Sequence, residues 1–291
     1  MAARRLDFVK MHGLGNDYVL FDADRTDLGG VDLSELSGQV CRRRFSVGGD
    51  GIIVLSAADG EADFTMRVFN PDGSETGACG TAFRCAARYV YERRGFEKAA
   101  DGGVRIATSV RNVLAKVILP GDGGPPLFEV SMGKALFKRR EIPVAGDPED
   151  EFLMQPLRIL GKDVTVSAVS VGNPHAIVFC DDLRDADVET LGPALETHQA
   201  FPQRTNVQFV QVLSPHEIRV GIWERGTGTT LCCGTGACAS VAVAKRLSMV
   251  ETPVLVRMPG GELEIHVETD GDLVMIARAE FSYTGWLEYE A

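Results

Sequence analysis

Two similar segments constrain the fold of this 291-residue chain more than any other feature of its sequence. Gly80–Arg94 and Gly234–Leu247 each begin with Gly-Thr directly after a cysteine, and each carries Ala, Val and Cys on most faces of a helix. A helix that is apolar most of the way round is buried, so each segment predicts the centre of a hydrophobic core. The two cysteines, Cys79 and Cys233, are 154 residues apart.

A second pair of segments repeats at nearly the same offset. Gly15-Asn16 precedes the apolar run Tyr18–Phe21, and 157 residues later Gly172-Asn173 precedes the apolar run Ala176–Phe179. Two independent repeats at nearly one offset indicate an internal duplication. We therefore expect an α+β fold of two pseudo-symmetric domains, each a bent, mostly antiparallel sheet wrapped round a central apolar helix.

The rest of the chain favours strands over helices. Apolar residues alternate with polar ones in short runs bounded by Gly, Pro and Asp, which is typical of strands and hairpins. Pro- and Gly-rich stretches suggest a break in the chain near residues 121–126 and 145–150. We expect an N-terminal domain of residues 1–131 plus 278–291 that carries Cys79, and a C-terminal domain of residues 132–277 that carries Cys233. The expected strands are 64–69, 104–119, 164–171, 207–213, 218–223, 254–258 and 263–267, and the expected amphipathic helices are 31–43 and 186–198.

Charge and cysteine content exclude several classes of protein. Thirty Lys and Arg against 41 Asp and Glu give a net charge of −11, which disfavours nucleic acid and anionic membrane surfaces as partners. The longest uncharged stretch, residues 226–244, is too rich in Gly and Thr for a transmembrane helix. The seven cysteines are an odd number, and no secretory leader is recognisable at the N-terminus, so we expect a cytoplasmic protein without a disulfide framework.

The two helix-initial cysteines suggest acid–base chemistry. Pseudo-symmetry would bring both thiols to one cleft, and the positive end of each helix should lower their pKa. The free backbone N–H groups of Gly80, Thr81, Gly234 and Thr235 could hold a carboxylate while the adjacent carbon loses its proton. Two acid–base groups on opposite faces of one carbon predict racemisation without a cofactor. Nucleotide and metalloprotease motifs are absent from the sequence, and the cysteine spacings do not favour a metal site.

Five motifs occur in sequence order over nearly the whole chain. They are Met11–Tyr18, Asn70–Glu75, Gly172–His175, Arg204–Asn206 and Glu224–Gly236. Together they resemble the diaminopimelate epimerase family. The family implies a cofactor-independent isomerase that interconverts LL- and meso-diaminopimelate in lysine and peptidoglycan precursor biosynthesis. It also implies an amino-acid substrate and a homodimer.

The resemblance assigns roles to individual residues. Cys79 and Cys233 would be the catalytic pair, and Glu224 and Arg225 would receive the reacting ammonium group and the distal carboxylate. His175, together with Glu224, would adjust the pKa of a catalytic thiol. The substrate-binding residues that it implies are Asn16, Asn70, Gly80, Thr81, Asn173, Asn206, Glu224, Arg225, Gly234 and Thr235.

Three departures from the commonest family pattern keep alternatives open. Thr81-Ala82 stands where most members have Asn-Gly, Gly51 where some have glutamine, and Thr229 where glutamate is frequent. The first alternative is a racemase of another amino acid, such as histidine or glutamate, that uses the same thiols. The second is a thiol-based redox or metal-binding protein, in which a reversible disulfide or a bound metal would be the working state.

Overall fold

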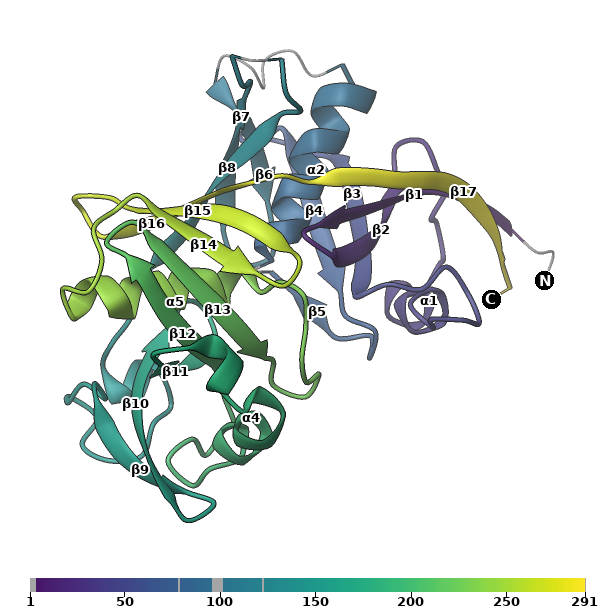
Figure 1. The fold of residues 1–291 in the computed structure, drawn as a ribbon. Coiled ribbons are helices and arrows are strands. Elements are labelled where there is room, and N and C mark those ends of the chain that lie inside the picture. The colour runs from purple at the N-terminus through teal and green to yellow at the C-terminus, as the bar shows by residue number, and fades with distance from the viewer. Residues whose placement is uncertain (1–3, 78, 96–101, 122, 291) are drawn as a thin grey trace. The chain divides into compact units, whose positions relative to one another are not determined.

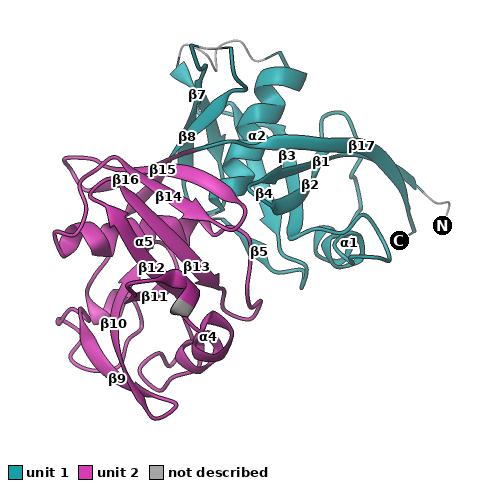
Figure 2. Ribbon diagram, in the orientation of Figure 1, with its two compact units in different colours: residues 1–130, 277–291 teal, residues 131–276 magenta. Residues whose placement is uncertain are grey.

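The protein is described from a computed structural model that covers residues 4–77, 79–95, 102–121 and 123–290 (Figure 1). The chain forms two compact units, residues 1–130 with 277–291 and residues 131–276 (Figure 2). The domain bounds expected from the sequence stay a prediction, because compactness alone does not test which segments fold by themselves.

Unit 1 combines nearly all of the N-terminal strands with the last strand of the chain. β17 pairs antiparallel with β1, and β1 pairs antiparallel with β2, so the two ends of the chain meet in one sheet. The elements of unit 1 are β1 (Arg4–Gly13), β2 (Asn16–Asp22), α1 (Leu33–Val40), β3 (Gly51–Ala57), β4 (Phe64–Phe69), β5 (Glu75–Thr76), α2 (Gly80–Arg93), β6 (Val104–Ala107), β7 (Asn112–Ile118), most of β8 (Leu127–Lys134, which crosses the bound) and β17 (Glu280–Tyr289).

Unit 2 is built from the middle of the chain. Its first hairpin joins β9 to β10, and its last joins β15 to β16. The elements of unit 2 are η1 (Arg139–Glu141), β9 (Gln155–Ile159), β10 (Lys162–Ser170), β11 (Pro174–Phe179), η2 (Leu183–Asp185), α4 (Val188–Glu196), β12 (Asn206–Ser214), β13 (Glu217–Trp223), α5 (Gly234–Arg246), β14 (Val254–Met258), β15 (Gly261–Val267) and β16 (Asp272–Ala277), whose last residue belongs to unit 1.

The strand pairings repeat from one unit to the other. In unit 1, β2 is parallel to β3, β3 is antiparallel to β4, β4 is parallel to β6, and β6 and β7 form a hairpin. In unit 2, β11, β12, β13, β14 and β15 follow the same sequence of parallel and antiparallel pairings. The α+β architecture with an internal repeat is therefore confirmed.

The helix that follows each cysteine is buried, as its composition predicts. Ten residues of α2 between Gly80 and Val90 are buried, and α5 is buried from Gly236 to Ala244. Small Ala, Gly and Cys side chains let the surrounding strands approach both helices closely. The amphipathic α1 and α4 instead bury one face against a sheet, which is the behaviour expected of a surface helix.

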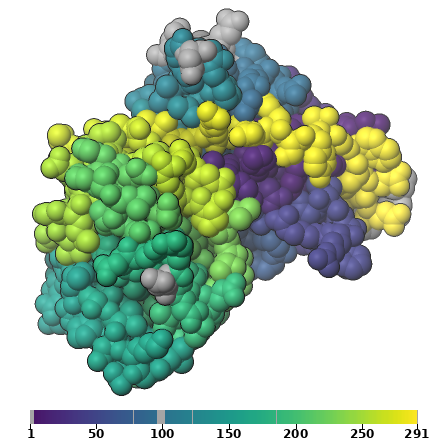
Figure 3. Space-filling view, viewed as in Figure 1, coloured from purple at the N-terminus to yellow at the C-terminus, as the bar shows by residue number. Residues whose placement is uncertain are grey.

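The β17 strand differs from the buried strands because most of its side chains are exposed. On the face drawn in Figure 3, β17 lies at the surface in yellow beside the purple N-terminal strands. Its partner β1 alternates buried and charged residues, such as buried Leu6 and exposed Arg5. No helix within the described residues is both long and apolar enough to cross a membrane.

Candidate active site

The strand register of unit 1 gathers the predicted binding residues at one edge of its sheet. Tyr18 pairs with Gly51 at the start of two parallel strands, and Ile52 pairs with Phe69 at the end of β4. Asn16 begins β2 and Asn70 directly follows β4, so both asparagines lie at this edge. The sequence alone placed these residues in separate motifs, and the parallel pairing brings them together.

Cys79 caps α2 at the same edge. Its backbone is extended, with φ −130° and ψ 107°, and its Sγ accepts a hydrogen bond of 3.4 Å from the Ala82 N–H. Sulfur thus fills the position that Ser or Asp usually takes at a helix N-terminus. The Tyr18 hydroxyl lies 3.1 Å from the same sulfur. The motif analysis did not single out this tyrosine.

Two opposing influences act on the Cys79 thiol. Burial raises the pKa of Cys79 above its ordinary value, while the Tyr18 hydroxyl, the Ala82 N–H and the Arg84 charge act to lower it. The net shift is upward, so the expectation that the helix N-terminus lowers the pKa is wrong for this thiol. Desolvation of a charge outweighs the helix dipole because burial removes water from around the sulfur.

Arg84 is a further residue that the sequence analysis missed. It is fully buried, although arginine is rarely found there without partners. Its guanidinium donates to the Thr81 hydroxyl at 3.3 Å and to the Arg278 carbonyl at 3.2 Å. Arg84 therefore holds the side chain of Thr81, two residues from Cys79, and a positive charge is fixed inside the first turns of α2.

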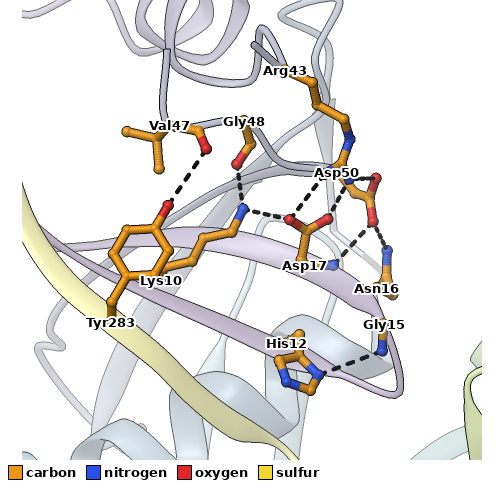
Figure 4. Close-up of polar contacts among 10 residues, drawn as sticks. All are labelled: Lys10, His12, Gly15, Asn16, Asp17, Arg43, Val47, Gly48, Asp50 and Tyr283. Atoms are coloured by element: carbon orange, nitrogen blue, oxygen red, sulfur yellow. Dashed lines mark hydrogen bonds and ion pairs between the residues drawn. The ribbon is translucent and has the colours of Figure 1, made fainter.

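A network of charged side chains holds Asn16 (Figure 4). Its Nδ2 donates to Asp50 Oδ2 at 2.9 Å, and the same carboxylate oxygen accepts the Asp17 N–H at 3.0 Å. Arg43 lies 2.8 Å from the other oxygen of Asp50, and buried Lys10 lies 2.6 Å from Asp17. An ionised carboxylate only accepts hydrogen bonds, so this contact fixes which end of the Asn16 amide faces Asp50.

The structure explains why position 51 is glycine. A Cβ there would lie 2.6 Å from the Phe69 carbonyl oxygen and 2.8 Å from the Tyr18 ring. The Tyr18 ring thus fills the space that a side chain at residue 51 would need. In this chain Gly51 therefore packs against the tyrosine that contacts Cys79.

Unit 2 presents a matching edge. His175 pairs with Asn206 at the start of two parallel strands, and Val207 pairs with Trp223 at the end of β13. Asn173 directly precedes β11 and Glu224 directly follows β13. These positions correspond to Asn16 and Asn70 in unit 1.

Cys233 caps α5 with nearly the same backbone as Cys79, φ −133° and ψ 106°. Its Sγ lies 3.5 Å from the Thr235 hydroxyl, and its residue is 6% exposed. Burial raises the pKa of Cys233 well above its ordinary value, and the negative charge of Glu224 raises it further. The predicted lowering of this pKa is also wrong. Glu224 is itself held by the Thr230 hydroxyl, which donates to Oε1 at 2.6 Å.

His175 is fully buried between two amide side chains. Its Nδ1 lies 3.0 Å from Gln208 Oε1, and its Nε2 lies 2.8 Å from Asn173 Oδ1. Burial lowers the pKa of His175 to about 4, so the ring is neutral at pH 7. Both ring nitrogens face amide oxygens, and one of these belongs to Asn173.

Asn206 and Glu196 fix the loop that carries Arg225. The Asn206 amide donates to the Pro174 carbonyl at 3.0 Å and accepts the Arg225 N–H at 2.9 Å. Buried Glu196 accepts the Gly226 N–H at 2.8 Å from the same loop. The Arg225 side chain is exposed beyond these anchors. Glu196 lies in α4, and its role could not be read from the motifs.

The seven cysteines are all free thiols. Within the part of the chain that the structure describes, no three His, Cys, Asp or Glu side chains cluster as a metal ion would require. The roles assigned by resemblance to the residues of both edges remain proposals.

Comparison with known proteins identifies the family to which this chain belongs. A diaminopimelate epimerase family model matches residues 8–136 and 167–282. The chain belongs to the diaminopimelate epimerase family. The family's diaminopimelate epimerase from Methanothermobacter thermautotrophicus is 45% identical over 265 residues, which cover 91% of both chains. Its relative from Carboxydothermus hydrogenoformans is 42% identical over 281 residues, 96% of this chain and 98% of the relative.

Solved structures share the fold of this family member at low sequence identity. A PhzF-family phenazine biosynthesis protein from Bacillus anthracis superposes with a TM-score of 0.71 and 14% identity, covering 99% of this chain and 100% of the other. A hydroxyproline epimerase from Agrobacterium vitis gives 0.70 and 15%, covering 98% of this chain and 93% of the other. At such identity these likenesses concern the fold alone, and they confirm the expected diaminopimelate epimerase-like fold.

Proposed function

We propose that the chain interconverts LL- and meso-diaminopimelate by a cofactor-independent reaction in which Cys79 and Cys233 are the two acid–base groups. The observation that carries the proposal is that both cysteines cap buried helices with nearly identical backbone angles. Family membership, with full-length relatives above 40% identity, supports diaminopimelate as the substrate.

The reaction moves two protons. One thiolate removes the α-proton of the substrate and becomes a thiol, and the other thiol delivers its proton to the opposite face of the carbon. The α-carboxylate gains negative charge in between, and the backbone N–H groups at the starts of α2 and α5 stabilise it. Each well-placed donor contributes roughly 3 to 4 kcal/mol at such a transition state.

The raised pKa values of both thiols favour the protonated form, which is the form that acts as the acid. A thiol that stays protonated in the unliganded chain is available as the acid, and its counterpart must become a thiolate when substrate arrives. Glu224 opposes the thiolate form of Cys233 in the unliganded chain. An ammonium group bound to Glu224 would cancel that charge, so substrate binding itself would promote ionisation of Cys233.

The remaining binding residues divide the substrate between them. Arg225 would clamp the distal carboxylate with its planar guanidinium. Asn206 holds the backbone of Arg225, and its second amide N–H would bind substrate. Asn16, Asn70 and Asn173 would bind the polar groups of the substrate. The homodimer, the cytoplasmic location and the place in lysine biosynthesis belong to the same proposal and rest on the family resemblance.

The test is incubation with LL-diaminopimelate in heavy water after exhaustive chelation. We expect meso product carrying one solvent deuterium at the inverted α-carbon. Turnover of histidine or glutamate instead would favour the alternative racemase. Activity that disappears on chelation and returns with one metal would favour the metal-binding alternative, and thiol titration would reveal a working disulfide.

A further inference from the structure

Tyr18 contacts the sulfur of Cys79, a proposed catalytic residue, and the sequence motif that contains Tyr18 does not explain this contact. Its hydroxyl oxygen lies 3.1 Å from Cys79 Sγ, within hydrogen-bond distance for sulfur. The tyrosine is 6% exposed, so water competes little for this contact. Tyr18 follows Asn16 by two residues on β2, and alternate residues of a strand face the same side.

The internal repeat gives Tyr18 a counterpart. Tyr18 and His175 are 157 residues apart, the same offset that separates Asn16 from Asn173. Each also holds the same register, since Tyr18 pairs with Gly51 and His175 pairs with Asn206 in equivalent parallel ladders. The duplicated position therefore carries an imidazole bound to two amides in unit 2 and a phenol that reaches the thiol in unit 1.

The groups that lower the pKa of the Cys79 thiol come from β2 and from the start of α2. Arg84 contributes a buried positive charge from α2, and the Ala82 N–H donates from the helix backbone. The thiol of Cys85, six residues after Cys79, is buried, and burial raises its pKa to about 12, so it stays neutral. Tyr18 contributes a side-chain hydroxyl beside Cys79, and a phenol can donate a hydrogen bond to a thiolate or accept one from a thiol.

We propose that Tyr18 is a positioning residue whose hydroxyl donates to the Cys79 thiolate, stabilising that form and fixing the direction of the sulfur. The catalytic importance of this contact rests on the proposed epimerase function. When Cys79 accepts the substrate proton, the phenol keeps its own proton and the hydrogen bond reverses direction. Tyr18 itself transfers no proton to substrate.

Tyr18→Phe tests the proposal because it removes one oxygen and leaves the ring beside Gly51. Alkylation of each cysteine by iodoacetamide, followed by peptide mass spectrometry across the alkaline range, reports the thiolate fraction. We expect the pKa of Cys79 to rise by about one to two units and its alkylation below that pKa to slow roughly 10- to 100-fold. Cys233 should keep its profile.

Tyr89→Phe is the matched control. Its hydroxyl donates to Asp22 at 2.8 Å, in the same unit and away from Cys79, so its removal should leave both cysteine profiles unchanged. An unchanged Cys79 profile in Tyr18→Phe would overturn the proposal. An equal shift of both cysteines would also overturn it, because it would indicate a general change in structure.

A second measurement covers a Tyr18→Phe variant that melts early. In wild-type protein labelled with ¹³Cζ-tyrosine, the Tyr18 signal should titrate together with the Cys79 thiol, and a flat signal would overturn the proposal. Neither measurement uses substrate. A shifted Cys79 pKa in a protein that does not turn over diaminopimelate would therefore refute the proposed function alone. Normal turnover with no shift would refute the role of Tyr18 alone.

Discussion

Replacing Asp50 by Asn should impair catalysis through Asn16. The carboxylate fixes the Asn16 amide by accepting its Nδ2–H at 2.9 Å. A neutral amide at residue 50 can donate as well as accept hydrogen bonds, so the amide group of Asn16 could rotate and exchange its oxygen and nitrogen positions. A hydrogen bond to a charged group contributes about 1.5 to 3 kcal/mol, but the Asp50 side chain is 38% exposed, and solvent screening reduces this to about 1 kcal/mol. We therefore expect kcat/KM to fall about fivefold.

A double-mutant cycle separates this effect from a general loss of structure. In an Asn16→Ala background, Asp50→Asn should change kcat/KM by less than about twofold, because the side chain through which Asp50 acts is gone. Arg43→Gln is the control, since Arg43 contacts the same carboxylate from the solvent side with a 58% exposed side chain. Arg43→Gln should leave kcat/KM within about twofold. Equal losses from Asp50→Asn in both backgrounds would refute the reasoning.

Three further predictions follow from single contacts. The unfolding free energy measured with urea should fall by about 3 kcal/mol as the pH drops from about 6.5 towards 4. The folded chain keeps His175 neutral with a pKa of about 4, whereas the unfolded chain protonates it, so acid favours the unfolded state. A His175→Gln variant should show a smaller fall. Arg225→Lys should raise KM about tenfold with little change in thermal stability, since a point charge cannot replace a planar clamp, and unchanged kinetics would remove Arg225 from the site. Gly51→Ala should lower the unfolding free energy by about 1 to 3 kcal/mol because its Cβ meets the Phe69 carbonyl and the Tyr18 ring, and an unchanged melting temperature would contradict the packing described.

Local signals predict the buried helices and several of the short strands well. The Gly-Thr start and the unbroken Ala-rich stretch placed α2 within one residue of its observed end, and residues 254–258 coincide with β14. The alternation over 104–119 predicts one strand, but the structure has two, because Thr108–Arg111 forms a turn between β6 and β7. The alternation continues through both strands and hides the turn.

Contacts between distant segments could not be read in the same way. β1 pairs with β17, from Arg4 with Tyr289 to His12 with Glu280, although the two strands lie at opposite ends of the sequence. A local pattern does not indicate which distant strand will be the partner. The Tyr18–Cys79 contact joins β2 to the start of α2 over 61 residues of sequence, and no local pattern specifies it.

The electrostatics of the thiols shows a second limit of sequence reasoning. A helix N-terminus is visible in the sequence, so its effect on a thiol pKa was predicted. The depth of burial of Cys79 and Cys233 is set by tertiary packing, and it dominates both pKa values. The role of Arg84 could not be predicted for the same reason, because it depends on the buried groups that the guanidinium contacts.

The central claim is that two thiols serve opposite faces of one carbon, and deuterium exchange in the Cys79→Ala and Cys233→Ala variants tests it most directly. Each variant should melt like the wild type within a few degrees, since loss of a buried thiol costs on the order of 1 kcal/mol, and each should fail to invert diaminopimelate. The surviving thiol can still remove and return a proton on its own side. We therefore predict slow deuterium exchange into one stereoisomer in one variant and into the other stereoisomer in the second. Substantial epimerisation by either variant, or the same exchange preference in both, would contradict the two-base account.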